Sequence, residues 1–182
     1  MSNGASMEPI ENSPRPIVVC DAGPLIHLDE VGCLDLLADF SAVLVPDAVW
    51  KEVQVHRPSA LIAPNGNWRR VSPLTPPPPE LLALSQIFSL HRGEWEAIRV
   101  ALDHPGALFL TDDTAARMAA ASLEISAHGS IGILVRAIRR NQRSEEQIIA
   151  ILHGMPMNSS LHLKPSLLEA VILEVKQSRQ GP

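Results

Sequence analysis

The feature that most constrains the fold is a set of short apolar runs, rich in β-branched residues, that alternate with segments of helical spacing. Three of these runs, of the kind buried in a parallel sheet, cover residues 16–20, 42–45 and 107–111. Shorter strands are expected near residues 68–71 and 125–127. The intervening segments predict helices over residues 22–37 in one or two pieces, 46–53, 80–90, 94–103, 114–122, 129–140, 144–152 and 165–177. This alternation predicts an α/β fold with a parallel sheet.

The composition fits one folded domain, because 46% of the 182 residues are hydrophobic and only 19% are charged. We expect a flexible leader at residues 1–15, a domain over residues 16–177 with a proline-rich insertion at about 56–79, and a tail at residues 178–182. The leader lacks the apolar core of a signal peptide, and no apolar run approaches the roughly 20 residues of a membrane helix. The expected location is therefore the cytoplasm.

The charge and cysteine counts exclude several classes of protein. The chain has 15 Lys and Arg residues against 20 Asp and Glu residues, so its formal net charge is −5. This balance argues against a broadly cationic nucleic-acid binder, but it does not exclude a local basic face. The two cysteines, Cys20 and Cys33, form no CxxC motif, which argues against a structural zinc site or a disulfide framework.

Carboxylates follow two of the predicted strands at the point where each strand ends. Asp21 follows the first run, and Asp112 and Asp113 follow the run at 107–111. Ligands of open α/β sheets bind beyond the carboxyl ends of the strands, and carboxylates gathered there favour Mg²⁺ or Mn²⁺. The alternative is that each Asp is a turn residue or a helix N-cap. By spacing alone, Glu52 and Glu94 are ordinary surface residues of helices.

Taken together, these segments resemble a PIN domain, of a branch related to the VapC-type toxins. The resemblance covers about residues 16–177, and its five motifs occur in the order typical of the family. They are Val19-Cys20-Asp21-Ala22-Gly23-Pro24-Leu25-Ile26, Val45-Pro46 leading to Val49 and Glu52, Arg92-Gly93-Glu94 with Ala97-Ile98, Leu110-Thr111-Asp112-Asp113 with Ala116-Arg117, and His128-Gly129-Ser130-Ile131-Gly132-Ile133-Leu134. The resemblance implies a three-layer α/β/α sandwich with a central parallel sheet.

The resemblance also implies a Mg²⁺- or Mn²⁺-dependent nuclease that usually acts on RNA. Asp21 matches the first acid of the family, Glu52 the second and Glu94 the third. The fourth falls on the Asp112-Asp113 pair, where Asp113 ranks first and Asp112 is the alternative. Asp21, Glu94 and Asp113 are then the expected metal ligands, Glu52 completes the acidic pocket, and Thr111 positions water or a phosphate oxygen. The expected reaction is metal-assisted hydrolysis of a phosphodiester bond.

Basic residues are expected to help an acidic pocket to bind RNA. Four arginines at spacings of three and four residues would share one helical face if the helix extends far enough: Arg136, Arg139, Arg140 and Arg143. They form either a solvated charged face or a stripe that contacts phosphates. Arg117 could pair with Asp113 or a phosphate, or could form a structural ion pair.

Two other functions compete with a metal-dependent endoribonuclease. One is another Mg²⁺-dependent phosphohydrolase on a similar sheet, although Asp21 is not followed by the Asp-x-Asp pattern of haloacid-dehalogenase-type phosphatases. The other is an interaction module with weak or lost catalysis. The partners that the resemblance implies are an RNA substrate, a second copy of the chain in a homodimer and, if the protein is the toxin of a toxin–antitoxin pair, a small antitoxin. The proline-rich insertion departs from the compact toxins.

Overall fold

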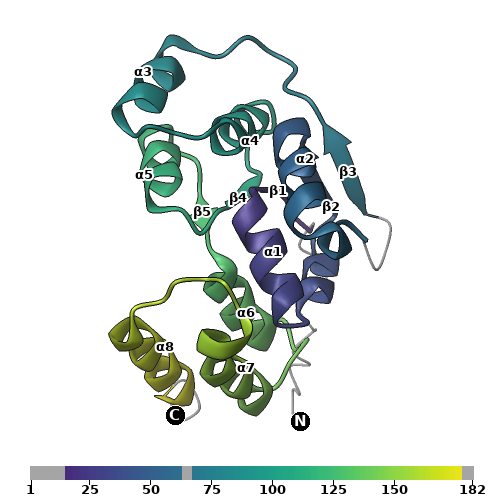
Figure 1. Ribbon diagram of the computed structural model, residues 1–182, viewed down its shortest axis with the longest axis vertical. Helices are drawn as coiled ribbons and strands as arrows, with labels where there is room; N and C mark the ends of the chain where they lie inside the picture. Colours follow the sequence, from purple (N-terminus) through teal and green to yellow (C-terminus); the bar gives the residue numbers. More distant parts are fainter. Residues whose placement is uncertain (1–14, 63–66, 178–182) are drawn as a thin grey trace, which may run out of the picture.

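A computed structural model describes residues 15–62 and 67–177, and it confirms a parallel α/β architecture (Figure 1). Five parallel strands form one sheet in the order β3-β2-β1-β4-β5. Their bounds are β1 Ile17–Cys20, β2 Ala42–Pro46, β3 Trp68–Val71, β4 Leu108–Leu110 and β5 Ala127–His128. The expected leader at residues 1–14 and the tail at 178–182 lie outside the described residues.

The central strands form where the sequence places β-branched and large apolar residues in succession. Every residue of β2 is buried, and so are the last three residues of β1. Strand β1 lies between β2 and β4, with Val19 opposite Leu44 on one side and Phe109 on the other. Strands β1 and β4 therefore end side by side, where the chain direction across the sheet reverses. Such a switch point is the expected ligand site of an open α/β sheet.

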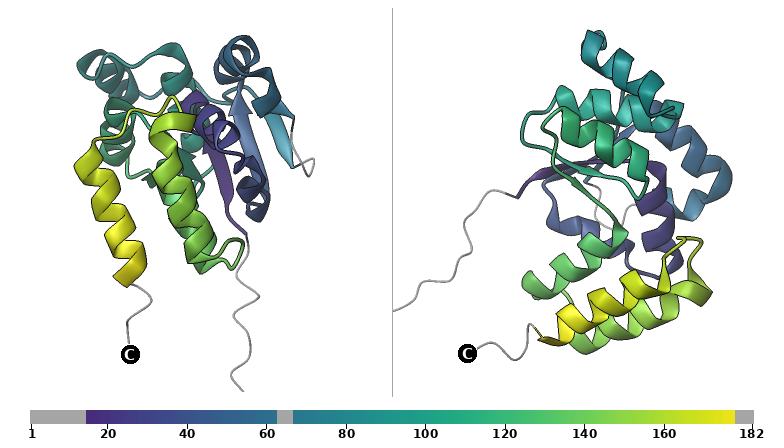
Figure 2. Two further views of the ribbon diagram at one scale, coloured as in Figure 1. Left: turned by 60° about the horizontal axis from the view of Figure 1, so that its bottom comes forward. Right: turned by 90° about the vertical axis from the view of Figure 1, so that its left-hand side faces the viewer.

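Helices flank the sheet on both sides, as Figure 2 shows. The eight α-helices are α1 Ala22–Glu30, α2 Asp47–His56, α3 Pro79–Ile87, α4 Arg92–Leu102, α5 Thr114–Ser122, α6 Ser130–Arg139, α7 Glu145–Asn158 and α8 Pro165–Gln177, and two short 3₁₀ helices, η1 Leu34–Asp39 and η2 Pro58–Leu61, complete the described segments. Helix α4 packs against α2 and against the three central strands. The last two helices lie side by side and follow α6 (Figure 2).

Most element positions agree with the pattern of the sequence, and the differences are at the ends. Helix α7 continues to Asn158, six residues beyond the predicted end, because Ile148, Leu152 and Met155 keep one buried face. The predicted strand at residues 68–71 is present as β3, inside the proline-rich insertion. Among the described residues, no helix has both the length and the apolar character needed to cross a membrane.

Candidate active site

The candidate site lies at the carboxyl ends of β1 and β4, where four elements supply its acidic residues. Asp21 directly follows β1, and its backbone N–H donates to the carbonyl of Leu110, the last residue of β4, at 2.8 Å. Asp112 and Asp113 follow β4, and Asp113 is the N-cap of α5. Helices α2 and α4 add Glu52 and Glu94. The parallel pairing of β1 with β4 thus brings together residues that are about 90 positions apart in the sequence.

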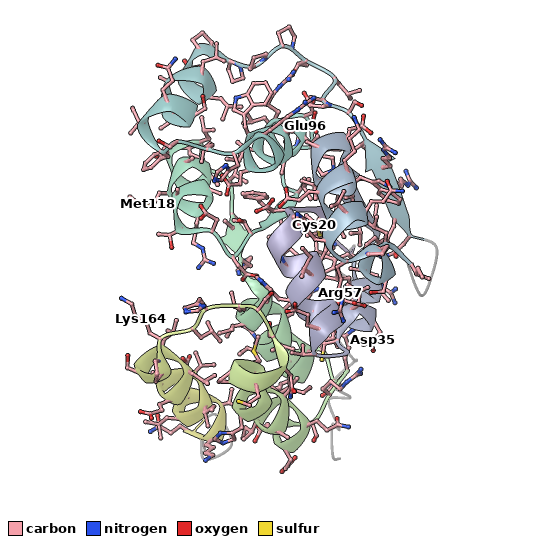
Figure 3. All side chains as sticks on the ribbon, in the orientation of Figure 1. Cys20, Asp35, Arg57, Glu96, Met118 and Lys164 are labelled. Carbon is pink, nitrogen blue, oxygen red and sulfur yellow. The ribbon has the colours of Figure 1, made fainter. Side chains whose placement is uncertain are left out.

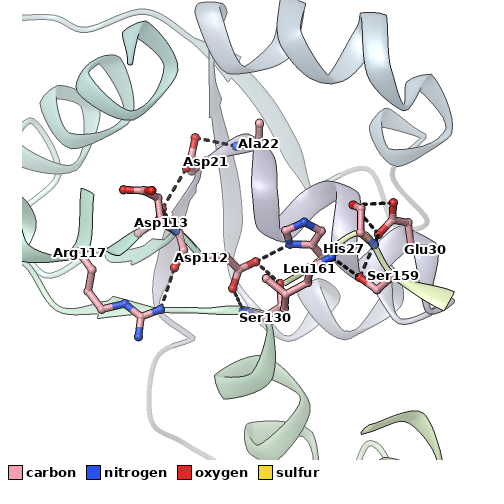
Figure 4. A network of polar contacts seen from close by, with 12 residues as sticks. Asp21, Ala22, His27, Glu30, Asp112, Asp113, Arg117, Ser130, Ser159 and Leu161 are labelled. Carbon is pink, nitrogen blue, oxygen red and sulfur yellow. Dashed lines mark hydrogen bonds and ion pairs between the residues drawn. The ribbon is translucent and has the colours of Figure 1, made fainter. Parts of the chain in front are cut away.

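Asp21 is the most buried acid of the site, with 7% of its surface exposed. Its carboxylate accepts hydrogen bonds from the Ala22 N–H at 2.8 Å and from the Thr111 hydroxyl at 3.0 Å (Figure 4). Burial nevertheless raises the pKa of Asp21 to about 7, and the nearby charges of Glu94 and Glu52 act in the same direction. A carboxyl group with such a pKa is only partly ionised at neutral pH, and a nearby cation would favour the ionised form.

Glu94 and Glu52 face the same space as Asp21 from two neighbouring helices. A Cβ atom at Gly93 would lie 3.2 Å from Glu52 Oε2 and 3.8 Å from Asp21 Oδ1, so the missing side chain at residue 93 lets α4 approach both acids. Glu94 is half-buried, and its Oε2 accepts from the His91 N–H at 2.8 Å. Burial raises the pKa of Glu94, with smaller contributions from Asp113 and Glu52. Glu52 is exposed at the edge of the site.

The two neighbouring aspartates, Asp112 and Asp113, point in different directions. Asp113 lies on the side of Glu94 and caps α5 by accepting from the Ala116 N–H at 2.7 Å. Asp112 instead accepts from the Ser130 hydroxyl at 2.6 Å and the Ser130 N–H at 2.7 Å, and contacts His27 Nδ1 at 2.8 Å (Figure 4). Burial acts to raise the pKa of Asp112, but these hydrogen bonds lower it overall.

Thr111 and Arg117 support the backbone around this pair. The buried Thr111 hydroxyl donates to Asp21 and accepts from the Asp113 N–H at 3.2 Å, so one side chain joins the acids of the two strands. Arg117 Nη2 donates to the Thr111 carbonyl at 3.1 Å. This is a hydrogen bond to the backbone, and neither the ion pair with Asp113 nor another ion pair of Arg117 is formed among the described residues.

These acids line an open cavity of about 820 Å³. Its wall also contains Arg92 of the third motif and residues that the sequence did not indicate as part of the site. These are His27 and Lys51 from α1 and α2, His91 at the start of α4, and Leu161 and His162 from the connection between α7 and α8. Nothing in their local sequence distinguishes these residues from surface residues. The cavity falls within the usual size range of ligand sites, and several polar side chains converge on it.

The family of the chain is decided by a comparison with protein-family models. A model of the family DUF3368, described as a PIN domain, matches residues 17–177, which is most of the chain. The chain belongs to the PIN-domain family. Comparisons with curated proteins and with solved structures gave no match. The fold and the order of motifs of this PIN domain agree with the resemblance seen in its sequence. PIN domains are generally nucleases, and their nucleases generally use divalent metal ions.

The acidic residues of this PIN domain fit a divalent cation in their chemistry. The donor set consists of carboxylate oxygens alone, which is the ligand type of Mg²⁺ and Mn²⁺. Among the described residues, no three His, Cys, Asp or Glu side chains already surround one point at metal-binding distance. The hydrogen bonds explain this, because Glu94 turns back to the His91 N–H and Asp113 turns to the Ala116 N–H. Side-chain rotations of these acids would be needed to gather the carboxylates on one ion.

Three of the four arginines of the expected stripe, Arg136, Arg140 and Arg143, bind acids at the opposite end of the sheet of this PIN domain. Arg139 instead lines a cavity between α6 and α8. Helix α6 ends at Arg139, so the condition for one continuous helical face, that the helix extends as far as Arg143, is not met. Arg136 and Arg140 both bind Asp39, at 2.5 Å and 3.0 Å, and Arg143 binds Asp35 at 2.6 Å. Both acids belong to η1, just before β2 begins. Parallel strands begin at the end of the sheet away from Asp21. Contact of these arginines with phosphate stays a prediction.

Proposed function

We propose that this PIN domain is a divalent-metal-dependent nuclease that hydrolyses RNA phosphodiester bonds as an endoribonuclease. The observation that supports it most directly is the meeting of Asp21, Glu52, Glu94 and Asp113 in one cavity, where burial and mutual repulsion raise the pKa values of Asp21 and Glu94. Carboxylates held together without a cationic partner are costly to a fold, and perturbed acids of this kind cluster at functional sites.

In this proposal, Asp21, Glu94 and Asp113 hold the cation, with Asp112 as the alternative at the fourth position. Asp113 is preferred because its charge acts on Glu94, whereas Asp112 is already bound by His27 and Ser130. Mg²⁺ or Mn²⁺, when bound, supplies Lewis-acid charge that activates water and neutralises phosphoryl oxygens. Glu52 adds negative charge at the open rim of the pocket. The Thr111 hydroxyl orients the Asp21 carboxylate and the backbone of Asp113.

The decisive experiment is cleavage of defined RNAs and single-stranded DNA by the wild-type protein and by Asp21→Asn, with Mg²⁺, Mn²⁺ or EDTA. We expect metal-dependent cleavage by the wild type and a loss of at least about 100-fold in Asp21→Asn, equivalent to roughly 2.7 kcal/mol of transition-state stabilisation. The matched control is Asp35→Asn in η1, which removes one carboxylate at the other end of the sheet and should retain cleavage. Near-wild-type cleavage by Asp21→Asn at saturating Mg²⁺ would exclude this mechanism.

Two alternatives are separated by simple measurements. Calorimetric titration with Mn²⁺ distinguishes the nuclease from an inactive interaction module, because a degenerate site should not bind the ion. Hydrolysis of a phosphomonoester, without cleavage of RNA, would instead indicate another metal-dependent phosphohydrolase. The roles as a toxin and as a homodimer rest on the resemblance alone. Growth arrest on expression in bacteria and the mass of the protein in solution test these two roles.

A further inference from the structure

A second cavity adjoins the acidic pocket and differs from it in charge. Its volume is about 590 Å³, and it shares Asp112, Leu161 and His162 with the first cavity. One side is formed by Arg117 of α5 and by the segment around β5, which includes His128. The other side is formed by residues 161–164, which connect α7 to α8, and by the start of α8. The two cavities therefore adjoin next to the end of β4, and together they are called the groove.

The change of charge along this groove is abrupt. The first cavity contains all of the proposed acidic ligands, whereas Asp112 is the only carboxylate among the described residues that line the second. Asp112 is already bound by His27 and Ser130. The second cavity carries Arg117 and His128 on one wall and Lys164 and His162 on the other. Figure 3 shows Lys164 on the connection that lies across the opening from α5.

The wall that carries Lys164 is held in place although it has no regular secondary structure. Glu30, at the end of α1, accepts hydrogen bonds from the Ser159 hydroxyl at 3.0 Å, the Ser160 N–H at 2.7 Å and the Ser160 hydroxyl at 2.9 Å (Figure 4). The Ser159 hydroxyl also accepts from the Leu161 N–H at 3.1 Å. The connection is thus tied to the same helix that supplies His27 to the acidic pocket, so its position relative to the acids is fixed.

The basic side chains retain the capacity to bind an anion. Arg117 uses one of its five N–H groups for the Thr111 carbonyl, and both Arg117 and Lys164 are exposed. Burial, together with the charges of Arg117, Arg139 and Arg136, lowers the pKa of His128. The positive charge of the groove therefore comes mainly from Arg117 and Lys164. The apolar residues Leu161 and Leu163 line the same cavity on the wall that carries Lys164 and offer contact area for sugars or bases.

We infer that this second cavity binds the phosphodiester backbone of a single nucleic-acid strand and leads it into the acidic pocket, with Arg117 and Lys164 as its phosphate-binding residues. This inference rests on the proposed nuclease function and adds the path of its substrate. An acidic pocket by itself repels a polyanion, so a cationic surface next to it would hold the strand on either side of the scissile bond. The C-terminal connection then belongs to the substrate site rather than to the scaffold.

The test is binding of labelled single strands in EDTA, which prevents metal-dependent cleavage. Oligouridylate and oligothymidylate of about 12 nucleotides are suitable probes, with an RNA duplex as a further arm. The double variant Arg117→Gln/Lys164→Gln should bind at least about 10-fold more weakly than the wild type. Its salt dependence should be flatter by about 1.4 in log–log slope, or about 0.7 for each lost phosphate contact. The matched control Arg69→Gln/Lys176→Gln removes the same charges outside the groove and should bind as the wild type does.

The outcomes separate the inference from the function on which it rests. Loss of binding to RNA alone identifies RNA as the ligand, and equal loss for both single strands shows that the groove holds either backbone. Unchanged affinity and slope in the groove variant, or wild-type protein that binds no single strand, would overturn the inference even if the protein cleaves RNA. Absence of cleavage with Mg²⁺ and Mn²⁺ would instead contradict the nuclease while leaving a positive binding result in place. The same binding titration is repeated with Mg²⁺ in Asp21→Asn protein, which should not cleave the strand. It checks that a bound cation does not take over the contribution of Arg117 and Lys164 to strand binding.

Discussion

The carboxylates at the two ends of the sheet differ in whether a cationic side chain is bound to them. At the carboxyl ends of the strands, Asp21 and Glu94 face other acids, and their pKa values are raised. Among the described residues, neither acid forms an ion pair with Lys or Arg. At the other end, Asp39 has a side chain that is only 9% exposed, and it is bound by Arg136 and Arg140. The same residue type is therefore compensated in one place and left uncompensated in the other.

This contrast separates a structural role from a functional one. The carboxylate of Asp39 is compensated and joins η1 to α6. Its net contribution to the stability of the fold depends on the geometry of its ion pairs. An uncompensated cluster lowers the stability of the fold, so its retention suggests that a ligand supplies the missing positive charge. The acidic excess of the whole chain, −5 in net charge, does not reveal which carboxylates belong to which class.

The largest expected effect is on the pH dependence of stability at the uncompensated end. The folded-state pKa of Asp21 lies near 7, above its ordinary value of 3.8, so the folded protein binds more protons than the unfolded chain between these values. Stability should then fall as pH rises through this range and level off above about pH 7. The total loss is on the order of 4 kcal/mol, and roughly 3 kcal/mol of it falls between about pH 5 and pH 8. Urea denaturation in EDTA measures it.

The Asp21→Asn protein should lack most of this pH dependence and should be more stable than the wild type above pH 7 in EDTA. The asparagine keeps the size of the side chain and can still accept from the Ala22 N–H. Asp35→Asn is the control, since it should retain the wild-type slope. A wild-type protein whose stability does not change from pH 5 to pH 8 would show that the pKa of Asp21 is not raised. The contrast between the two ends of the sheet would then be lost.

A smaller effect is expected from Asp39→Asn at the compensated end. The change leaves Arg136 and Arg140 without their shared carboxylate, so we expect a loss of about 1–3 kcal/mol in the free energy of unfolding. RNA cleavage by the folded protein should be unchanged, because Asp39 lies at the far end of the strands from Asp21. Cleavage assays and urea denaturation on the same preparation test both statements. A selective loss of cleavage without loss of stability would contradict the structural role.

The smallest effect is expected from the double variant Arg136→Gln/Arg140→Gln. Because both guanidinium groups bind Asp39, their removal should change the log–log salt slope of RNA binding by less than about 0.7, the value of one phosphate contact on a single strand. The double variant Arg117→Gln/Lys164→Gln, measured in the same titration, is the internal reference for the salt slope. A slope as flat as that of the groove variant would restore the phosphate-contacting stripe and place substrate at both ends of the molecule.

Local patterns were sufficient for most of the fold. The buried runs at β1, β2 and β4 are short, apolar and bounded by Asp or Pro, and such runs have few other stable arrangements. The end of α7 was missed because a proline near its C-terminus resembles a stop signal, whereas Pro156 sits in the last turn, just after the buried Met155. The end of α6 at Arg139 agrees to within one residue with the end predicted from the sequence.

The sequence by itself determined the fold class and which acids stand at strand ends, because these depend on spacing along the chain. Its motifs resembled those of the family that the comparison shows. Only the tertiary structure decided how neighbouring side chains divide between partners. The resemblance ranked Asp113 before Asp112 but did not exclude either, and in the fold Asp112 faces His27 and Ser130 whereas Asp113 faces Glu94. In the same way, the sequence gives no difference between Arg136 and Lys164. Folding places the carboxylate of Asp39 beside Arg136 and the second cavity beside Lys164. Charge compensation depends on distances across the fold, which no local pattern contains.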